Sequence, residues 1–258
     1  SFSHSKLSYY SQLFRRTDTD IVHISHGIKR YAVTRSYHNF QLSGNAIKRM
    51  KDRLNWLVVL SKRKWVKSYT NKKFHFNCGM YTLTLPSVQR HPTSFINKYL
   101  LDDFLKVLRY KGMCNYVWRL EFQNNGNVHY HIVTDKYFDY FFIQKKWNRI
   151  LKKYGYIQAY TDKFSNMDFP EYFDYIKRNV KKDIDVVICK KWYDSGCKNY
   201  WKNPKSVNVK RVHGKNLANY LTRYFSKTGC KHNSLDTKEN SEGLRLWYCS
   251  KELSRISN

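Results

Sequence analysis

The chain has 258 residues, with 48 Lys and Arg against 19 Asp and Glu, which gives a formal net charge of +29 at pH 7. An excess of this size is unusual for an enzyme of neutral small molecules, and it indicates a polyanionic partner such as a nucleic-acid backbone. Hydrophobic residues make up 41% of the chain and aromatic residues 17%, which excludes intrinsic disorder as the main state. The composition therefore predicts a folded, basic protein that binds nucleic acid.

Three further features restrict the class of protein. The six cysteines form no C-x-x-C pair, so neither a zinc ribbon nor an extracellular disulfide scaffold is indicated. The longest wholly apolar run covers only residues 56–60, far short of the roughly 20 residues that a membrane-spanning helix needs. The first twenty residues contain no apolar block, so we expect no secretory signal. We expect an intracellular protein, in the cytoplasm of a host cell or in an organelle, with reduced thiols and no membrane partner.

Residues 1–73 are expected to form a basic N-terminal arm that ends in a helix. Residues 1–45 are polar and weakly periodic, and within them only Tyr31–Thr34 indicates a strand. From Ala46 to Leu60, apolar residues recur at helical spacing with lysines and arginines between them, which predicts a basic amphipathic helix. A packing helix with a solvated basic face explains this pattern better than a membrane-binding helix does.

A basic stretch with one aromatic residue follows this helix. Lys62, Arg63 and Lys64 directly precede Trp65. Cations beside an aromatic side chain could bind a DNA backbone while the ring stacks on a base. A solvated charged segment explains the same residues about equally well, so both interpretations stay open.

The compact domain is expected over residues 74–230, followed by a polar C-terminal tail at 231–258. Alternating β-forming residues predict its strands, and helical periodicity bounded by Pro or Gly predicts its helices. In chain order we expect strand Met80–Leu85, helix Phe95–Leu108, strands Tyr116–Phe122 and Val128–Val133, helix Tyr140–Tyr154, strand Tyr156–Tyr160, a helical and irregular insertion over 161–204, strand Ser206–Val212 and helix Lys215–Lys227. This order predicts an α+β fold with a central antiparallel β-sheet flanked by helices.

Two histidines in the strand Val128–Val133 are the first candidates for chemistry. His129 and His131 are two residues apart, so in a strand their imidazoles point to one face while Tyr130 points to the other. Two imidazoles in this arrangement are suited to holding one divalent cation. An H-x-H pair alone is a weak signal, and packing explains it at least as well.

The turn before this strand decides what lies beside the histidines. A three-residue loop at 124–126, with Gly126 in the left-handed bulge position, pairs Glu121 with His129 and Arg119 with His131. A two-residue turn would shift the register by one and send Glu121 to the opposite face.

We favour the three-residue loop because it aligns two apolar stripes. Trp118, Leu120 and Phe122 then share a face with Tyr130 and Ile132. In this register a carboxylate lies beside two imidazoles. That set of donors fits Mg²⁺ or Mn²⁺ better than a structural zinc site.

Two tyrosines in the helix Lys215–Lys227 are the second candidates. Tyr220 and Tyr224 lie on one helical face, about 6 Å apart along the axis, and Arg223 and Lys227 follow them by three residues each. A phenol with a pKa of ~10 is a poor nucleophile at neutral pH. A cation and a metal-polarised phosphate would make its attack feasible. In a chain with 22 tyrosines, helix packing alone also explains the pair.

Three blocks of sequence together resemble the HUH-type rolling-circle replication initiators, in particular the two-tyrosine proteins of small single-stranded DNA phages and related plasmids. The blocks are YTLTLPS at 81–87, YVWRLEFQNNGNVHYH at 116–131 and NYLTRYFSK at 219–227. They occur in the order found in the family, and the likeness extends from about Ala46 to Lys227. The middle block is the specific one, whereas the first is generic strand sequence.

The resemblance implies an HUH endonuclease fold with a ferredoxin-like or RRM-like core, and it implies a metal site. His129 and His131, with Glu121 as a third ligand, would hold Mg²⁺ or Mn²⁺ at the scissile phosphate. In such proteins a tyrosine attacks the phosphate, which leaves a 5′-phosphotyrosine link and a free 3′-OH that primes synthesis. A second tyrosine can resolve the product and rejoin the strand.

The resemblance also assigns the residues around the nucleophile. Tyr220 and Tyr224 would be the nucleophiles, and Lys227 occupies the position of the lysine in the family's motif. Arg223 stands where many relatives have lysine, so a planar fork replaces a point donor and the contact geometry differs. The residues expected to contact DNA are Arg223, Arg119, Lys62, Arg63, Lys64 and Trp65.

The implied partners are a single-stranded DNA origin, which could form a hairpin, and host replication proteins. The chain contains no G-x-x-x-x-G-K-[ST] motif, so it carries no fused helicase of that type. A host helicase would unwind the duplex, and a host DNA polymerase would extend the 3′-OH.

Two other functions use the same residues differently. A transposase or a mobilisation protein would use the same chemistry, although a tyrosine helix on the C-terminal side of the histidines suits an initiator better than a relaxase. A non-enzymatic single-strand-binding protein would explain the charge and the aromatic residues. It gives no reason for Glu121, His129 and His131 to share a face, and metal-independent binding would favour it.

Overall fold

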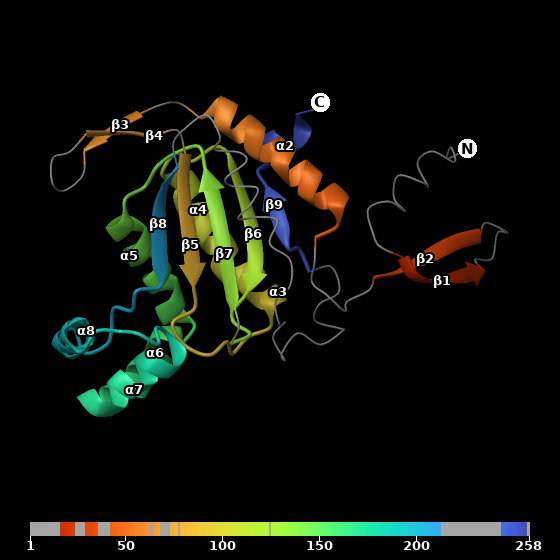
Figure 1. The fold of residues 1–258 in the computed structure, drawn as a ribbon. Helices are drawn as coiled ribbons and strands as arrows, with labels where there is room; N and C mark the ends of the chain where they lie inside the picture. Colours follow the sequence, from red (N-terminus) through yellow and green to blue (C-terminus); the bar gives the residue numbers. More distant parts are fainter. Residues whose placement is uncertain are drawn as a thin grey trace.

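The computed structural model describes residues 16–23, 29–35, 42–61, 64–67, 73–76, 78–123, 125–212 and 244–256. Its centre is a five-stranded sheet in the order β8-β5-β7-β6-β9, in which every neighbouring pair is antiparallel (Figure 1). The strands are β5 (Cys78–Thr84), β6 (Tyr116–Phe122), β7 (Val128–Thr134), β8 (Val207–Val212) and β9 (Trp247–Cys249). Helices flank this sheet, which confirms the α+β fold with a central antiparallel sheet.

One face of the sheet is apolar along its whole length and is covered by helices. Alternate residues such as Leu83, Leu120 and Tyr130 point to this face and are buried, as the period of two in a strand requires. The covering elements are the short helix α3 (Thr93–Phe95), the π-helical turn η1 (Ile96–Leu101), α4 (Asp102–Tyr110) and α5 (Tyr140–Lys153). Phe104 and Trp147 are the largest helical side chains in this core. We call this side the helix-covered face.

The opposite face is divided into an apolar half and a polar half. Helix α2 (Gly44–Leu60) packs Met50, Leu54 and Leu57 on the apolar half, against β-strand residues that include Met80 and Val133. Leu253 of α11 (Lys251–Arg255) joins the same core. Further along the same strands the side chains on this face become polar; they are Thr82, Thr84, Arg119, Glu121, His129 and His131. We call these six residues the polar half.

The insertion at 161–204 is helical and has its own core. Helices α6 (Tyr156–Ser165), α7 (Phe169–Asn179) and α8 (Val186–Lys198) surround an aromatic cluster that includes Phe164, Tyr172 and Trp201. Helix α7 begins with a capping box formed by Asp168 and Glu171, an arrangement that satisfies two of the amide groups left open at a helix start.

The predicted strand Tyr156–Tyr160 is wrong, because these residues form the first half of α6. Gly155, with φ of 78°, ends α5 and allows the chain to turn into a second helix. Ile157 and Phe164 then lie seven residues apart on one buried stripe. A five-residue window rich in β-forming residues does not reveal this longer period.

The remaining elements extend or refine the predictions. The N-terminal residues include a hairpin of β1 (Arg16–His23) and β2 (Lys29–Arg35), and β2 contains the predicted strand Tyr31–Thr34. A second hairpin joins β3 (Lys64–Lys67) to β4 (Lys73–Phe76). The polar tail contributes β9 and α11 to the sheet and its core. Within the described ranges, no helix combines the length and the apolar character needed to cross a membrane.

Candidate nicking site on the polar half of the sheet

The β6–β7 hairpin has the predicted register. The amide of Gln123 donates to the carbonyl of Asn127 at 2.8 Å, and the amide of Gly126 donates to the carbonyl of Gln123 at 2.8 Å. Gly126 has φ of 81°, which is the left-handed conformation that this loop requires. Glu121 therefore lies opposite His129, and Arg119 opposite His131.

The start of β7 is fixed to the segment that follows β5. The side chain of Asn127 accepts a hydrogen bond from the Gln89 amide at 2.9 Å and donates to the Ser87 carbonyl at 2.8 Å. The side chain of Gln89 in turn accepts from the amide of Val128 at 2.9 Å. Asn127 and Gln89 are both buried. These bonds fix the hairpin two residues before His129.

The two imidazoles lie side by side on β7, with their ring centroids 4.7 Å apart. Each contacts a threonine hydroxyl on the neighbouring strand β5. The Nδ1 atom of His131 is 3.2 Å from Oγ1 of Thr82, and Nδ1 of His129 is 3.3 Å from Oγ1 of Thr84. When a hydroxyl accepts from Nδ1–H, it leaves Nε2 as the lone-pair nitrogen of a neutral ring.

These two threonines were not among the site residues predicted from the sequence. The alternation in YTLTLPS places Thr82 and Thr84 on one face of β5, which was the available signal. That pattern does not identify the partner strand, because β5 pairs with β7 across more than 40 residues of chain. The indole of Trp147 on α5 donates to the Thr84 carbonyl at 3.1 Å and holds this end of β5.

Glu121 connects the histidines to Arg119. Its Oε2 atom is 3.1 Å from Nε2 of His131, and its Oε1 atom is 3.4 Å from Nη1 of Arg119. Oε1 is buried and accepts no hydrogen bond from a described residue. Burial alone would raise the pKa of Glu121, but the hydrogen bond with His131 and the charge of Arg119 hold it below its usual value.

His129 is the least charged of these groups at neutral pH. Burial lowers its pKa to about 4, and the neighbouring His131 adds to this effect. A neutral imidazole is the form that binds a metal ion. No described residue makes a hydrogen bond to Nε2 of His129.

These residues fit a divalent cation in chemistry, and one change of contact would complete the site. No three His, Cys, Asp or Glu side chains among the described residues already converge as metal ligands, because Glu121 contacts Arg119 and His131 instead. The donors available are Nε2 of His129, Nε2 of His131 and the unsatisfied Oε1 of Glu121. Two imidazole nitrogens and one carboxylate oxygen suit Mn²⁺ or Mg²⁺.

The other predicted site residues are distributed as follows. Arg119 is 6% exposed, so its guanidinium contacts the carboxylate of Glu121 more than solvent. Trp65 on β3 is 70% exposed, and Lys64 lies on the same strand. The positions outside the described residues are Lys62, Arg63, Tyr220, Arg223, Tyr224 and Lys227.

Comparison with known proteins adds a family to this geometry. A family model for the replication-associated protein ORF2 matches residues 78–229, which is more than half of the chain. No curated protein and no solved structure matches the chain. The matched region begins at the first residue of β5, includes the β6–β7 hairpin and extends beyond β8 to cover Tyr220 and Tyr224. The chain therefore belongs to this family of replication-associated proteins, and it is a replication initiator that binds DNA at the origin.

Proposed function

We propose that this replication initiator nicks single-stranded origin DNA at the polar half of the sheet and joins itself to the 5′ end. The observation that carries the proposal is the placement of His129, His131 and Glu121 on one face, with threonine hydroxyls at both Nδ1 atoms. A binding protein has no need of this arrangement, whereas a phosphoryl-transfer site does.

His129, His131 and Glu121 would hold Mg²⁺ or Mn²⁺, which polarises the scissile phosphate when bound. Thr82 and Thr84 fix the rings so that Nε2 of each faces away from the strand they contact. The ion pair with Arg119 keeps the Glu121 carboxylate ionised. These residues thus prepare the ligands before DNA binds.

The nucleophile in this proposal is the phenol of Tyr220 or Tyr224. Its oxygen forms a bond to phosphorus while the bond from phosphorus to the 3′ oxygen breaks. The 3′ oxygen leaves with a proton, which yields a 5′-phosphotyrosine and a free 3′-OH. Lys227 and Arg223 would stabilise the negative charge that develops on the phosphate.

Chain length supports this pairing of residues. Val212, the last residue of β8, pairs with Cys78, and Tyr220 follows eight residues later. Eight extended residues reach up to about 28 Å. The histidine end of β5 at Thr84 lies six residues from Cys78, or about 20 Å along the strand. Tyr220 is therefore within reach of His129.

The reverse reaction would rejoin DNA. Attack by a 3′-OH on the phosphotyrosine releases the tyrosine and restores a phosphodiester. With the second tyrosine available for another attack, the chain could transfer and close a strand. A host helicase and a host DNA polymerase complete the proposed reaction sequence.

The proposal is tested with an end-labelled single-stranded origin oligonucleotide, Mn²⁺ or Mg²⁺ and a denaturing protein gel. We expect label on the protein that requires metal and is lost in His129→Ala and in the double variant Tyr220→Phe/Tyr224→Phe. Tyr200→Phe is the matched control, since Tyr200 is 72% exposed and belongs to the insertion. DNA binding without an adduct would favour the non-enzymatic single-strand-binding protein.

A further inference from the structure

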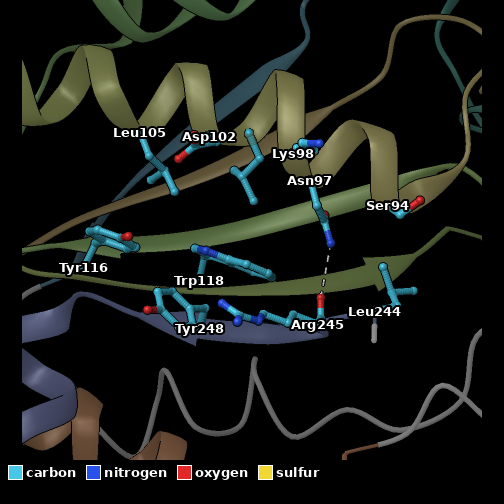
Figure 2. A pocket seen from close by; sticks show the side chains of 11 residues that line it. Ser94, Asn97, Lys98, Asp102, Leu105, Tyr116, Trp118, Leu244, Arg245 and Tyr248 are labelled. Atoms are coloured by element: carbon cyan, nitrogen blue, oxygen red, sulfur yellow. Dashed lines mark hydrogen bonds between the residues drawn. The ribbon is translucent and has the colours of Figure 1, made fainter. Parts of the chain in front are cut away.

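A groove lies at the edge of the sheet, on the helix-covered face and therefore opposite the polar half. It has a volume of about 420 Å³ and lies between η1 and α4 on one side and β6 and β9 on the other (Figure 2). Six of its lining residues carry the polar, charged and aromatic groups that a ligand would meet; they are Asn97, Lys98, Tyr116, Trp118, Arg245 and Tyr248. We call it the edge groove.

The groove exists because β9 extends the sheet beyond the covering helices. Tyr248 pairs with Trp118 across β9 and β6, so both rings are directed to the helix-covered face. Trp118 is 5% exposed, whereas Tyr248 is 37% exposed. Together they form an aromatic surface that starts in the core and ends in solvent.

The two walls of the groove are held together by Asn97. Its side-chain oxygen accepts a hydrogen bond from the Tyr130 hydroxyl at 2.6 Å, and its side-chain nitrogen donates to the Arg245 carbonyl at 3.3 Å. Figure 2 shows the second of these bonds crossing from the helix to the chain before β9. The groove is thus braced in its open form and needs little rearrangement to receive a ligand.

The mouth of the groove is positively charged. Lys98 and Arg245 are exposed, and neither forms an ion pair with a described acidic residue. Asp102, the only acidic residue of the lining, is 2.9 Å from Lys106 and 3.7 Å from Arg109. The Arg245 guanidinium lies 4.9 Å from the centre of the Tyr248 ring. Aromatic rings beside unneutralised cations match a planar base attached to a phosphate.

We propose that the edge groove binds one nucleotide of single-stranded DNA, with the base on Tyr248 and Trp118 and the phosphate at Lys98 and Arg245. This inference rests on the proposed function, which brings a single strand to the sheet. Strand β6 connects the two sites, since it carries Glu121 on one face and Trp118 on the other. From β7 to β9 is only two strand spacings, about 10 Å, so one strand of DNA could pass around the β9 edge.

The test is fluorescence anisotropy of a labelled dT12 oligonucleotide without divalent metal, at several salt concentrations. We expect Tyr248→Ser to weaken binding about tenfold with little change in salt dependence, because stacking neutralises no phosphate. Tyr248→Phe should bind like the wild type, because it keeps the ring. Equal affinity of Tyr248→Ser and wild type would overturn the proposal.

The charge part of the proposal is tested with Lys98→Ala/Arg245→Ala. Removing two phosphate contacts should flatten the slope of log K against log salt by about 1.4, or about 0.7 per phosphate on a single strand. The matched control is Lys191→Ala/Lys198→Ala on α8, which removes the same charge from exposed positions outside the groove. The same flattening in both double variants would contradict a specific site.

Cross-linking separates this inference from the proposed function. An oligonucleotide with 5-iodouracil should cross-link to Tyr248 or Trp118, as mapped by mass spectrometry of the peptides. Cross-links confined to other aromatic residues would overturn the groove even if the protein nicks DNA. Cross-links at Tyr248 in a protein that forms no adduct would support the groove and count against nicking alone.

Discussion

At the scale of single residues, the arrangement around the histidines depends on two hydroxyls that take no part in the chemistry. Thr82 and Thr84 contact Nδ1 of His131 and His129, and partners of this kind orient a metal-binding imidazole and fix its tautomer. Without them, each ring could rotate or exchange the roles of its two nitrogens. Thr82 and Thr84 are therefore positioning residues in the proposed site.

We predict that Thr84→Val lowers the affinity of the protein for Mn²⁺ by about tenfold, the lower end of the range for such outer partners. Thr84→Ser should restore binding because it keeps the hydroxyl. The measurement is titration of free Mn²⁺ by electron paramagnetic resonance without DNA. If the valine variant bound Mn²⁺ as tightly as wild type, the hydroxyl would have no role at the metal.

At the scale of elements, α2 is part of the core of the nicking domain rather than an accessory to it. Met50, Leu54 and Leu57 are fully buried against the apolar half of the sheet. The same face carries the polar half a few residues further along β5 and β7. Packing of α2 thus fixes the position of the strands that carry the histidines.

We predict that Leu54→Ala lowers the free energy of unfolding by about 3 kcal/mol, within the range for replacing part of a buried leucine side chain by a cavity. Val59→Ala is the control on the same helix, since Val59 is 71% exposed and should cost less than about 0.5 kcal/mol. Urea unfolding followed by circular dichroism measures both. A loss no greater than the control's would show that α2 is not coupled to the sheet.

The helices α6, α7 and α8 form a second packed element whose stability depends on tyrosines remaining neutral. Burial raises the pKa of Tyr160 to about 12, with a smaller contribution from Tyr175. An unfolded tyrosine ionises near pH ~10. The stabilising contribution of Tyr160 is therefore complete below pH ~10 and is lost as the pH rises through the folded-state pKa of about 12.

We predict that Tyr160→Phe and wild type have similar urea midpoints at pH 8 and diverge above pH ~10 in favour of the phenylalanine variant. The ring keeps its contacts with Phe164 and Trp201 but has no proton to lose. Parallel midpoints from pH 8 to pH 11 would mean that the buried hydroxyl does not titrate as expected.

At the scale of the whole molecule, a net charge of +29 serves DNA binding at a cost to the compact state. Like charges repel in the fold, and salt screens them with a Debye length that falls from about 10 Å at 0.1 M to about 3 Å at 1 M. We predict that Tm without DNA rises by several degrees between 50 and 500 mM NaCl. A Tm that stayed constant or fell would mean that opposite charges already compensate the excess.

The sequence predicts most where local chemistry decides the structure. The loop 124–126 sets its own register through Gly126, so the pairing of Glu121 with His129 follows from residues close in the chain. It predicts least where distant segments meet. The contacts of Thr82 and Thr84, the short edge strand β9 and the edge groove all depend on pairing across long stretches of chain. The start of α6 was ambiguous because five β-forming residues fit either period.

The most direct test of the central claim is to identify the atom to which the DNA is joined. The protein is incubated with origin single strand and Mn²⁺, the DNA is trimmed with nuclease, and the peptides are analysed by mass spectrometry. We predict a nucleotide linked through its 5′ phosphate to Tyr220 or Tyr224, absent in His131→Ala. A 5′-linked nucleotide on any other residue, or nicked DNA with a free 5′ phosphate and no linked peptide, would contradict it.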